Sequence, residues 1–474
     1  MEAFLDGLNK AVAAIDNVLA DYAITLLLIA CGLYFTVRTK FVQVRCFGEG
    51  WRKMFGEFSM NGKKADKAGM SSFQALTTAI AAQVGTGNIV GACGAILIGG
   101  PGAIFWMWVI VFLGMATIYA EATLAQKTRC TDEAGEITGG PVYYIKEAFR
   151  GKAGKIIAAF FSVMAILALG VMGVMVQSNS IGESMKTAFD IPKWAIGIGI
   201  TLFAAIVFFG GSKRLASVTE KIVPVMAILY IAGSLAVICV RIKYVPQTFG
   251  MIFKYAFRPD AIIGGGIGYA LKTAVSQGAK RGLFSNEAGM GSTPHAHAVA
   301  KVKNPHEQGV VAMIGVFIDT FIVLTMTALV IISTMYAGHS GTEGVAGYEK
   351  TNLAQAAFGS VFGEKAGSIF VAICLFFFAF STILSWNYFG RLNVTSLFGN
   401  KKSVHMIYNT VSLICVFIGT MLYNDLVWNL QDVFDLLIVI PNVAALFVLG
   451  SFVAKEARRD KNGLLQQERE KSLR

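Results

Sequence analysis

The stretch Gln83-Val84-Gly85-Thr86-Gly87-Asn88 places two glycines and an asparagine inside an apolar segment that covers residues 73–98. A bilayer core offers no water to backbone N–H and C=O groups, so a membrane helix can unwind only where protein or an aqueous cavity satisfies the freed groups. The stretch therefore predicts a broken transmembrane helix with a binding site near the membrane midplane.

The composition of the chain is that of an integral membrane protein. Of its 474 residues, 55% are hydrophobic and only 15% are charged, whereas a soluble domain carries roughly 25% charged residues. We therefore expect an all-α protein with about eleven transmembrane helices, each long enough to cross about 30 Å of hydrocarbon. The apolar windows lie at residues 21–37, 73–98, 105–125, 156–177, 194–210, 218–240, 262–290, 310–335, 369–386, 404–422 and 433–454.

Lysine and arginine give the chain a net charge of +12 and gather in alternate loops between these windows. The positive-inside rule places such loops in the cytoplasm, which predicts an external N-terminus and a cytoplasmic C-terminus. The loop at 241–258 departs from this rule, because it is basic and is expected outside. The placement of the charges argues against a nucleic-acid surface, and no feature indicates an obligate protein partner.

Motifs for catalysis or for a tightly bound metal are missing from the sequence. The seven cysteines form no CxxC pair, which is typical of buried reduced thiols. His295 and His297 are two residues apart and lie on different sides of a helix, with no carboxylate at i+4 spacing to complete a metal site. GxSxG, HExxH and P-loop patterns do not occur. The sequence therefore predicts a protein that is not an enzyme.

The glycines of the first stretch could serve a dinucleotide site or helix packing instead of an unwound binding site. Their pattern, Gly85-x-Gly87-x-x-x-Gly91, misses the GxGxxG spacing of a dinucleotide-binding loop, and no βαβ unit surrounds it. Gly87 and Gly91 do form a small-xxx-small face, which packs transmembrane helices closely. Helix packing stays open as the alternative to a binding site.

A second interruption occurs at Phe284-Ser285-Asn286-Glu287-Ala288-Gly289-Met290-Gly291. It falls in the sixth window counted from the one that holds the first interruption, so each interruption opens a group of five windows. Paired interruptions at corresponding positions indicate inverted repeats around a central site. We therefore divide the chain into a peripheral N-terminal helix with a basic cytoplasmic loop, two five-helix repeats and a basic cytoplasmic tail, at residues 1–70, 71–242, 243–455 and 456–474.

Four segments resemble a known family over essentially the full chain. These are AAQVGTGNIVG, GGPGAIFWMW, RGLFSNEAGMGS and FSTILSWNYFGR, which are similar to sequences of the bacterial alanine or glycine:cation symporters. That family belongs to the amino acid, polyamine and organocation superfamily. The resemblance implies the fold of the bacterial leucine transporter (LeuT), a 5+5 inverted repeat with discontinuous first and sixth core helices, in a multi-pass protein of the bacterial inner membrane.

A pair of broken helices suits an amino-acid zwitterion. Half-helix N-termini offer free N–H groups, and half-helix C-termini offer free carbonyl oxygens. We expect the N–H groups of Thr86, Gly87 and Asn88 to bind the substrate carboxylate, and Ser285 and Asn286 to face the ammonium group. Glycine lets a substrate approach the backbone without a Cβ in the way.

Bulky residues beside the interruptions predict a small substrate. Phe284, Met290 and Trp386 would close a pocket that excludes large side chains by sterics, so alanine and glycine fit, while D-alanine and serine stay open. All residues predicted to bind substrate are Thr78, Gln83, Gly85, Thr86, Gly87, Asn88, Phe284, Ser285, Asn286, Met290 and Trp386.

Sodium is the expected coupling ion, and it prefers oxygen ligands. The resemblance implies one sodium site made of the carbonyls of Ala81 and Val84 and the hydroxyls of Ser381 and Thr382. On the residues alone, the two hydroxyls would more simply be bonded to the carbonyls of the preceding helical turn.

The number of coupled cations stays open. The larger superfamily can hold a second sodium near the position of Asn88, but Thr86 and Glu287 depart from its pattern. The prediction is sodium-coupled symport of alanine and glycine into the cell by alternating access. The alternative is a proton-coupled or exchanging amino-acid transporter of the same fold.

Ionisable residues inside the apolar windows are costly in lipid and therefore point to function. Glu121 is expected near the cytoplasmic interface, whereas Asp319 is expected deeper and is the better functional candidate. The candidates for an external gate are two basic residues before the second interruption and two acids on the last helix, namely Lys280, Arg281, Asp432 and Asp435.

Overall fold

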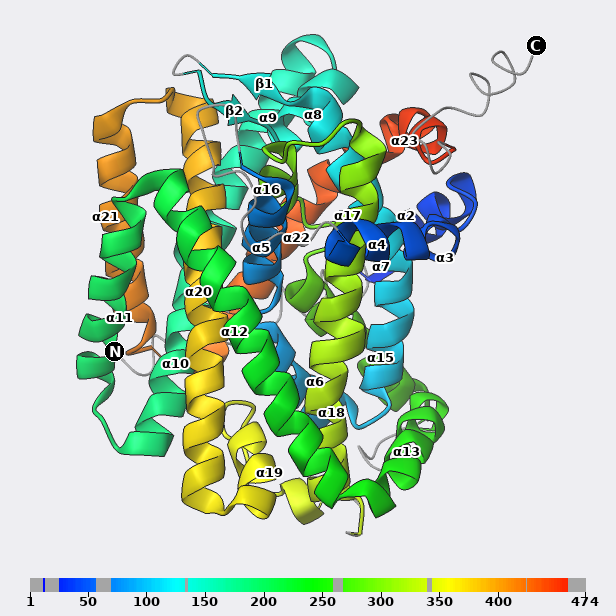
Figure 1. Cartoon of the computed structure of the whole chain (residues 1–474), viewed down its shortest axis with the longest axis vertical. Helices are drawn as coiled ribbons and strands as arrows, with labels where there is room; N and C mark the ends of the chain where they lie inside the picture. Colours follow the sequence, from blue (N-terminus) through cyan, green and yellow to red (C-terminus); the bar gives the residue numbers. More distant parts are fainter. Residues whose placement is uncertain are drawn as a thin grey trace.

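The computed structural model describes residue 12 and residues 25–56, 70–132, 135–258, 267–338, 343–422 and 424–458. The described chain is helical apart from loops and one antiparallel hairpin, β1 (Cys130–Thr131) with β2 (Ile137–Thr138). The long helices lie beside one another along the vertical axis of Figure 1. The predicted all-α class is confirmed.

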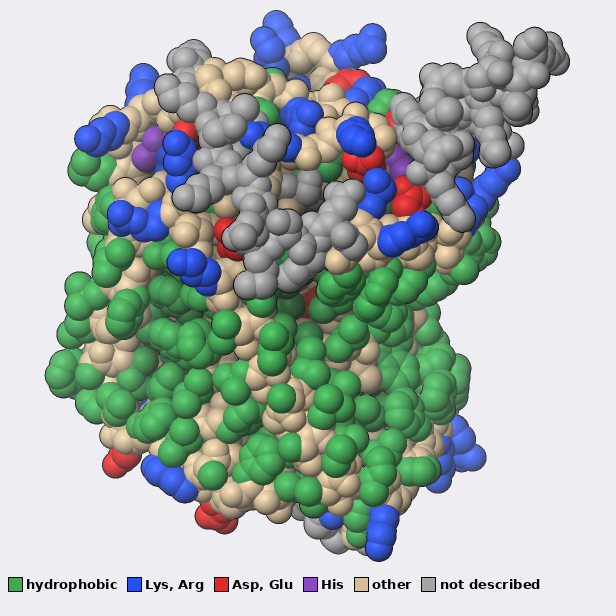
Figure 2. Space-filling view, viewed as in Figure 1, with side chains coloured by type: hydrophobic (Ala, Val, Ile, Leu, Met, Phe, Trp, Pro, Cys, Tyr) green, Lys and Arg blue, Asp and Glu red, His purple; other side chains and the backbone are tan. Residues whose placement is uncertain are grey.

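A broad belt of apolar side chains faces outward across the middle of the molecule, between two rims that carry the charged side chains (Figure 2). Leu202, Ile228 and Ile407 belong to the outward-facing apolar residues and are 63%, 69% and 66% exposed. Exposing this much apolar surface is unfavourable in water, whereas contact with lipid hydrocarbon is favourable. The chain is therefore an integral membrane protein.

Eight segments of the described chain can cross a bilayer by length and composition, if the bent pair at the first interruption is one of them. They are Phe73–Gln83 with Gly87–Gly99, Ala103–Thr128, Gly151–Phe189, Gly211–Val240, Pro305–Tyr336, Glu364–Phe398, Lys402–Gly419 and Val427–Val448. Three further predicted windows coincide with the helices α2, α11 and α15, which do not meet this test. The count of eleven stays a prediction.

The first half of the chain begins with a helix outside the predicted repeats and two short helices. A capping box of Ser71 and Gln74 then starts the first core helix, because each side chain bonds a free backbone N–H group of the first turn. The helices are α2 (Thr25–Arg38), α3 (Val42–Arg45), α4 (Phe47–Gly56), α5 (Ser72–Gln83), η2 (Gly87–Gly91), α6 (Ala92–Gly99), α7 (Ala103–Thr128), α8 (Pro141–Ala148), α9 (Gly151–Ala165), η3 (Ile166–Gly173), α10 (Val174–Phe189), α11 (Lys193–Phe208) and α12 (Gly211–Val240).

The second half contains helices in two segments that were expected to be loops, α13 and α19. Asn304 and Pro305 start α17, with the Asn304 carboxamide accepting from the Glu307 N–H group. The helices are η4 (Ile242–Tyr244), α13 (Val245–Phe257), α15 (Ile267–Asn286), α16 (Pro294–Ala298), α17 (Pro305–Phe317), η5 (Ile318–Leu324), α18 (Thr325–Ile331), η6 (Ile332–Tyr336), η7 (Glu343–Val345), α19 (Leu353–Phe362), α20 (Glu364–Phe398), α21 (Lys402–Gly419), α22 (Asn424–Val448) and α23 (Gly450–Glu456).

The short elements separate to the two ends of the helix bundle. In Figure 1 the hairpin, α8 and α23 lie at the upper end, and α13 and α19 lie at the lower end. The upper elements lie in or beside the basic segments at 127–155 and from 455 onward, which were predicted to be cytoplasmic. The expected orientation therefore assigns the upper end to the cytoplasm. Both interruptions lie between these ends, inside the bundle.

Candidate functional site

The first interruption is a break between α5 and η2. The helix ends at Gln83, Val84 leaves helical geometry with a ψ of 82°, and the following helix is inclined by 43°. The Asn88 carboxamide spans the break, because its Oδ1 accepts a hydrogen bond from the Gly85 N–H group at 3.1 Å and so satisfies a backbone donor that the break leaves free. The broken helix predicted from the sequence is confirmed.

Two of the three N–H groups predicted to bind a carboxylate have protein acceptors in this conformation. The Thr86 N–H donates to Gln177 Oε1 at 3.1 Å, and the Asn88 N–H donates to the Gly85 carbonyl at 3.3 Å. Gln177, on α10, was not among the residues predicted from the sequence. The polar run Gln177-Ser178-Asn179-Ser180, all buried within α10, was the signal that could have indicated it.

The second interruption is also a break, between α15 and α16. Glu287 has a φ of +59°, and Gly289 and Gly291 have φ of +95° and +81°. A left-handed conformation is unfavourable for a residue with a side chain and persists only where surrounding contacts hold it. Glu287 has such contacts, since its carboxylate accepts from Trp386 Nε1 at 2.6 Å and from the Ser292 hydroxyl.

Glu121 lies at the second break, and the expectation that it reaches the cytoplasmic interface is wrong. Its side chain is fully buried, and its carboxylate accepts from the N–H groups of Gly289 and Gly291, each at 3.0 Å. Asn442 on α22 donates to the same carboxylate at 2.6 Å and to the Gly289 carbonyl at 2.9 Å. A buried acid can be retained here because the break frees N–H groups that need an acceptor.

Asp319 joins the two breaks, which agrees with its expected depth in the membrane. It lies in η5 and is fully buried. Its carboxylate accepts from Asn88 Nδ2 at 2.7 Å in the first break and from Ser285 Oγ at 2.9 Å in the second. Thr320 Oγ1 donates to it at 2.7 Å. Three polar side chains from three segments therefore donate to one buried carboxylate.

Gly87 and Gln83 bring the two breaks into direct contact. A Cβ added to Gly87 would lie 2.8 Å from Ser285 Cα, which is closer than real Cβ contacts. Gln83 Nε2 donates to the Asn286 carbonyl at 3.0 Å. The φ of Gly87 is not positive, so close approach to the second break, and not a left-handed backbone, requires glycine here. Gly91 has only distant neighbours at 3.9 and 4.0 Å, so the two glycines do not form one tightly packed face.

Two predicted substrate residues have other contacts. Asn286 turns back on its own chain, since its Nδ2 donates to the Gly282 carbonyl at 2.5 Å and its Oδ1 accepts from the Ala288 N–H at 2.9 Å. It therefore caps the end of α15 and does not face an ammonium group in this conformation. Thr78 lies five residues before the break and meets Thr219 of α12 at 3.3 Å between hydroxyl oxygens, away from the residues that join the breaks.

The oxygens of the predicted sodium site converge where α20 crosses the first break. Thr382 Oγ1 donates to the Ala81 carbonyl at 2.9 Å, and Ser381 Oγ is 3.4 Å from the same oxygen. Both hydroxyls also reach the Phe378 carbonyl of their own helix, at 3.1 and 2.9 Å. The bonds to the preceding turn are thus present together with the contacts to the break. The Phe378 carbonyl is a further oxygen that the sequence did not indicate.

Val84, the fourth predicted sodium residue, lies next to this cluster. It is the C-cap of α5 and is 2% exposed. A Cβ added to the adjacent Gly85 would lie 2.4 Å from Thr382 Oγ1, so Thr382 packs directly on the break. Carbonyl and hydroxyl oxygens without thiols are a donor set that fits a hard cation such as sodium.

Aromatic side chains enclose the second break. The ring of Phe284 meets Trp386 edge-on at 5.7 Å between centroids and lies 4.7 Å from Trp428. A Cβ added to Gly173 would lie 2.2 Å from Trp386 Cε3, so Trp386 is held against η3. Met290 lies in the break itself and is fully buried. Aromatic contacts of this kind fix ring positions and therefore limit the size of any group bound between them.

Arg281 and Asp432 form a buried pair directly beyond these aromatic rings. The guanidinium donates to both carboxylate oxygens, at 3.1 and 2.8 Å, and lies 4.9 Å from the centroid of Trp428. Asp435, the other acid considered as a gate, accepts from Gln431 at 2.6 Å. Lys350, from the loop before α19, is also 5.3 Å from Trp428 and pairs with Asp425 at 2.9 Å.

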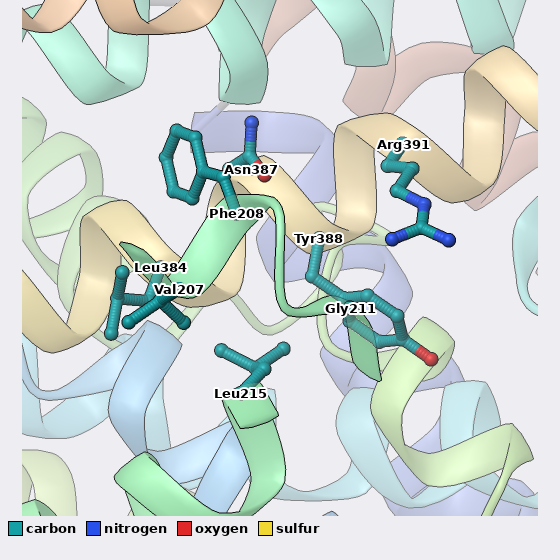
Figure 3. Close-up of a pocket in the computed structure, with 8 residues that line it drawn as sticks. All are labelled: Val207, Phe208, Gly211, Leu215, Leu384, Asn387, Tyr388 and Arg391. Atoms are coloured by element: carbon teal, nitrogen blue, oxygen red, sulfur yellow. The ribbon is translucent and has the colours of Figure 1, made fainter. Parts of the chain in front are cut away.

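The predicted substrate and sodium residues are closed to solvent in this conformation, since every one of them is buried. A separate pocket lies between α11, α12 and α20, with Leu384 and Val207 at one end and Arg391 at the other (Figure 3). Its lining includes none of the residues predicted to bind substrate or sodium. The lining residues are Val207, Phe208, Gly211, Leu215, Leu384, Asn387, Tyr388 and Arg391.

The chain is similar in sequence to known proteins over nearly its whole length. A model of the sodium:alanine symporter family matches residues 5–472. The sodium/alanine symporter AgcS of Methanococcus maripaludis is 38% identical over 91% of this chain and 92% of its own. The putative sodium/proton-dependent alanine carrier protein YrbD of Bacillus subtilis is 39% identical over 92% of this chain and 89% of its own.

A solved structure supports the fold alone. The manganese transporter of Eremococcus coleocola, in complex with an aromatic bis-isothiourea compound, aligns over 84% of this chain and 80% of its own, with a TM-score of 0.51 and 12% sequence identity. The helix arrangement with two central breaks is therefore that of the LeuT-like transporters expected from the sequence. The family match and the relatives show that the protein is a transporter and not an enzyme. The chain belongs to the sodium:alanine symporter family.

Proposed function

We propose that this protein carries alanine and glycine into the cell together with sodium, by alternating access. The observation that carries the proposal is the cluster of oxygens from Ala81, Ser381 and Thr382 at the first break. A sodium ion bound there would hold α20 to the C-terminal end of α5. Because the same break offers N–H groups on its other side, ion and substrate would be bound by one short segment.

The substrate carboxylate would take the place of Gln177 at the Thr86 N–H group. That N–H already has an acceptor oxygen at hydrogen-bond distance, and a carboxylate forms a stronger, charge-assisted bond than a neutral carboxamide. The Gly87 N–H beside it would be the second donor. The ammonium group would then meet acceptors at the second break, where Ser285 lies against Gly87.

Selectivity for a small side chain would come from Phe284 and Trp386. Trp386 cannot retreat toward η3 without displacing Gly173, and its indole N–H is held by Glu287. A larger substrate would have to move both groups. Alanine and glycine therefore fit better than longer amino acids, and competition by D-alanine and serine would define the limits of the pocket.

Asp319 would be a second place for a cation. Its carboxylate and the Ser285 hydroxyl provide oxygen ligands where both breaks meet, and Asn88 Nδ2 holds the carboxylate there by donating to it. A proton on Asp319 or on Glu287 would support the alternative of proton coupling, to which the name of the Bacillus relative also refers. The Arg281–Asp432 pair would close the external path on the outer side of the aromatic rings.

Uptake into proteoliposomes would test the coupling. We expect radiolabelled alanine to accumulate when external sodium is present and to remain at background when choline or potassium replaces it. Accumulation driven by a pH gradient without sodium would reject sodium coupling in favour of the proton-coupled alternative.

We assign the protein to the bacterial inner membrane with the N-terminus outside, which labelling of single cysteines from either side would test.

A further inference from the structure

A cluster of three metal-binding side chains lies outside the transport site, at the contact between α4 and α17. Cys46 Sγ, a Glu49 carboxylate oxygen and a His306 ring nitrogen lie within 4.8 Å of one another. Cys46 is 4% exposed, and the side chains of His306 and Glu49 are 1% and 14% exposed. The cluster is therefore inside the protein but retains a path to solvent at Glu49.

Two of the three ligand atoms already have the separation expected at a tetrahedral metal ion, and the third lies within 4.8 Å of both. Ligand atoms on one zinc ion lie about 3.5 Å apart, given metal–ligand distances near 2.0 to 2.3 Å. Glu49 Oε2 is already 3.4 Å from His306 Nε2. Cys46 directly precedes α4 and Glu49 lies in the first turn of that helix, so the two side chains are three residues apart in sequence and close in space. Small side-chain rotations would bring all three groups to one ion.

His306 is also supported in the way that metal-binding histidines usually are. Its Nδ1 is hydrogen-bonded to the Tyr119 hydroxyl at 2.7 Å, which orients the ring and turns Nε2 toward Glu49. Such a second partner on the far ring nitrogen is a recurrent feature of metal sites. A simple ion pair between Glu49 and His306 would not account for the thiol of Cys46 beside both groups.

We propose that Cys46, Glu49 and His306 bind a transition-metal ion of the Zn²⁺ type. Thiolate and imidazole favour such ions over sodium, magnesium or calcium, and three protein ligands leave the fourth position of a tetrahedral ion for water. The ion would link α4, which lies outside the predicted spans, to the first turn of α17. The Lys53–Glu307 ion pair at 3.0 Å joins the same two helices one to two turns away.

Cobalt binding to the purified full-length protein tests the site without any transport assay. Co²⁺ bound to a cysteine thiolate gives a charge-transfer band in the near ultraviolet, and tetrahedral coordination gives intense visible bands. We expect both bands in the wild-type protein and their loss on addition of Zn²⁺. Cys46→Ser should abolish the charge-transfer band, while Cys130→Ser, which removes an exposed free thiol, should leave it unchanged.

Two further variants keep the proposal open to refutation if Cys46→Ser does not fold. Glu49→Gln alters a partly exposed ligand, and Tyr119→Phe removes only the partner of His306, so each should weaken cobalt binding by about 10-fold or more. Unchanged affinity in both variants, a charge-transfer band that survives Cys46→Ser, or no band in the wild-type protein would each overturn the proposal.

An effect of the ion on transport rests on the proposed function and is a separate measurement. Zn²⁺ should slow alanine uptake by the wild-type protein and should not slow uptake by Glu49→Gln. If Zn²⁺ does not slow alanine uptake but the cobalt spectra are as expected, only control of transport by the metal is rejected. Absence of sodium-driven uptake with intact spectra would reject the proposed function and leave the metal site standing.

Discussion

Replacing Thr382 with alanine should weaken sodium activation of alanine uptake by roughly 10-fold or more. The change removes the oxygen that lies 2.9 Å from the Ala81 carbonyl. A polar contact to a charged group contributes about 1.5 to 3 kcal/mol, and about 1.4 kcal/mol corresponds to a factor of ten in affinity. Loss of stability should be smaller, near 1 kcal/mol, because the backbone bonds of α20 are unaffected.

The assay is the sodium dependence of uptake into proteoliposomes at fixed alanine concentration. Thr382→Ser restores a hydroxyl at the same place and should return the sodium dependence toward that of the wild type. Thr410→Ala is the matched control, because the Thr410 hydroxyl also donates to the preceding turn, at 2.9 Å to the Met406 carbonyl, but is exposed on α21. Unchanged sodium activation in Thr382→Ala, with normal yield and alanine affinity, would remove this hydroxyl from the mechanism.

Three further changes test other parts of the site. Gly87→Ala places a Cβ 2.8 Å from Ser285 Cα, so the breaks must separate and calorimetry should show weaker alanine binding; normal affinity with a lowered melting temperature would indicate a packing role alone. Glu121→Gln weakens two charge-assisted bonds to Gly289 and Gly291, which should lower stability by at least about 2 kcal/mol in detergent unfolding; an unchanged melting temperature would contradict this. Arg281→Lys loses the two-point contact with Asp432, and should increase labelling of a cysteine at Phe284 from outside, whereas unchanged labelling would exclude a gate.

The architecture followed from the sequence wherever composition and backbone chemistry act locally. Glycine, asparagine and serine inside apolar windows located both breaks, because few other residue types tolerate an unwound backbone at membrane depth. The helices α13 and α19 were not predicted, since they have only 13 and 10 residues and give no apolar signal of membrane-spanning length. The positions of α11 and α15 were close to those expected, but their length and polarity leave the number of spans as a prediction.

The partners of the breaks could not be read from the sequence in the same way. Glu121 is close to the end of its apolar window, and only the packing of α7 against the second break shows that it is buried there. Gln177 was hidden in a polar run whose orientation depends on the rotation of α10. Asn286 was assigned to the substrate because a carboxamide can serve either a ligand or its own backbone, and here it caps α15.

The two breaks are held in different ways, and this difference indicates how ligands would act. The second break is bound by the carboxylate of Glu121 and by Asn442, from two other helices. On its α10 and α20 sides, by contrast, the first break is held by neutral bonds from Gln177 and Thr382. A substrate carboxylate would replace the first of these bonds and a sodium ion the second, each with a stronger charged interaction. Binding of both ligands would therefore fasten the first break to the helices on either side of it, which gives a physical reason for the coupling between sodium and amino acid.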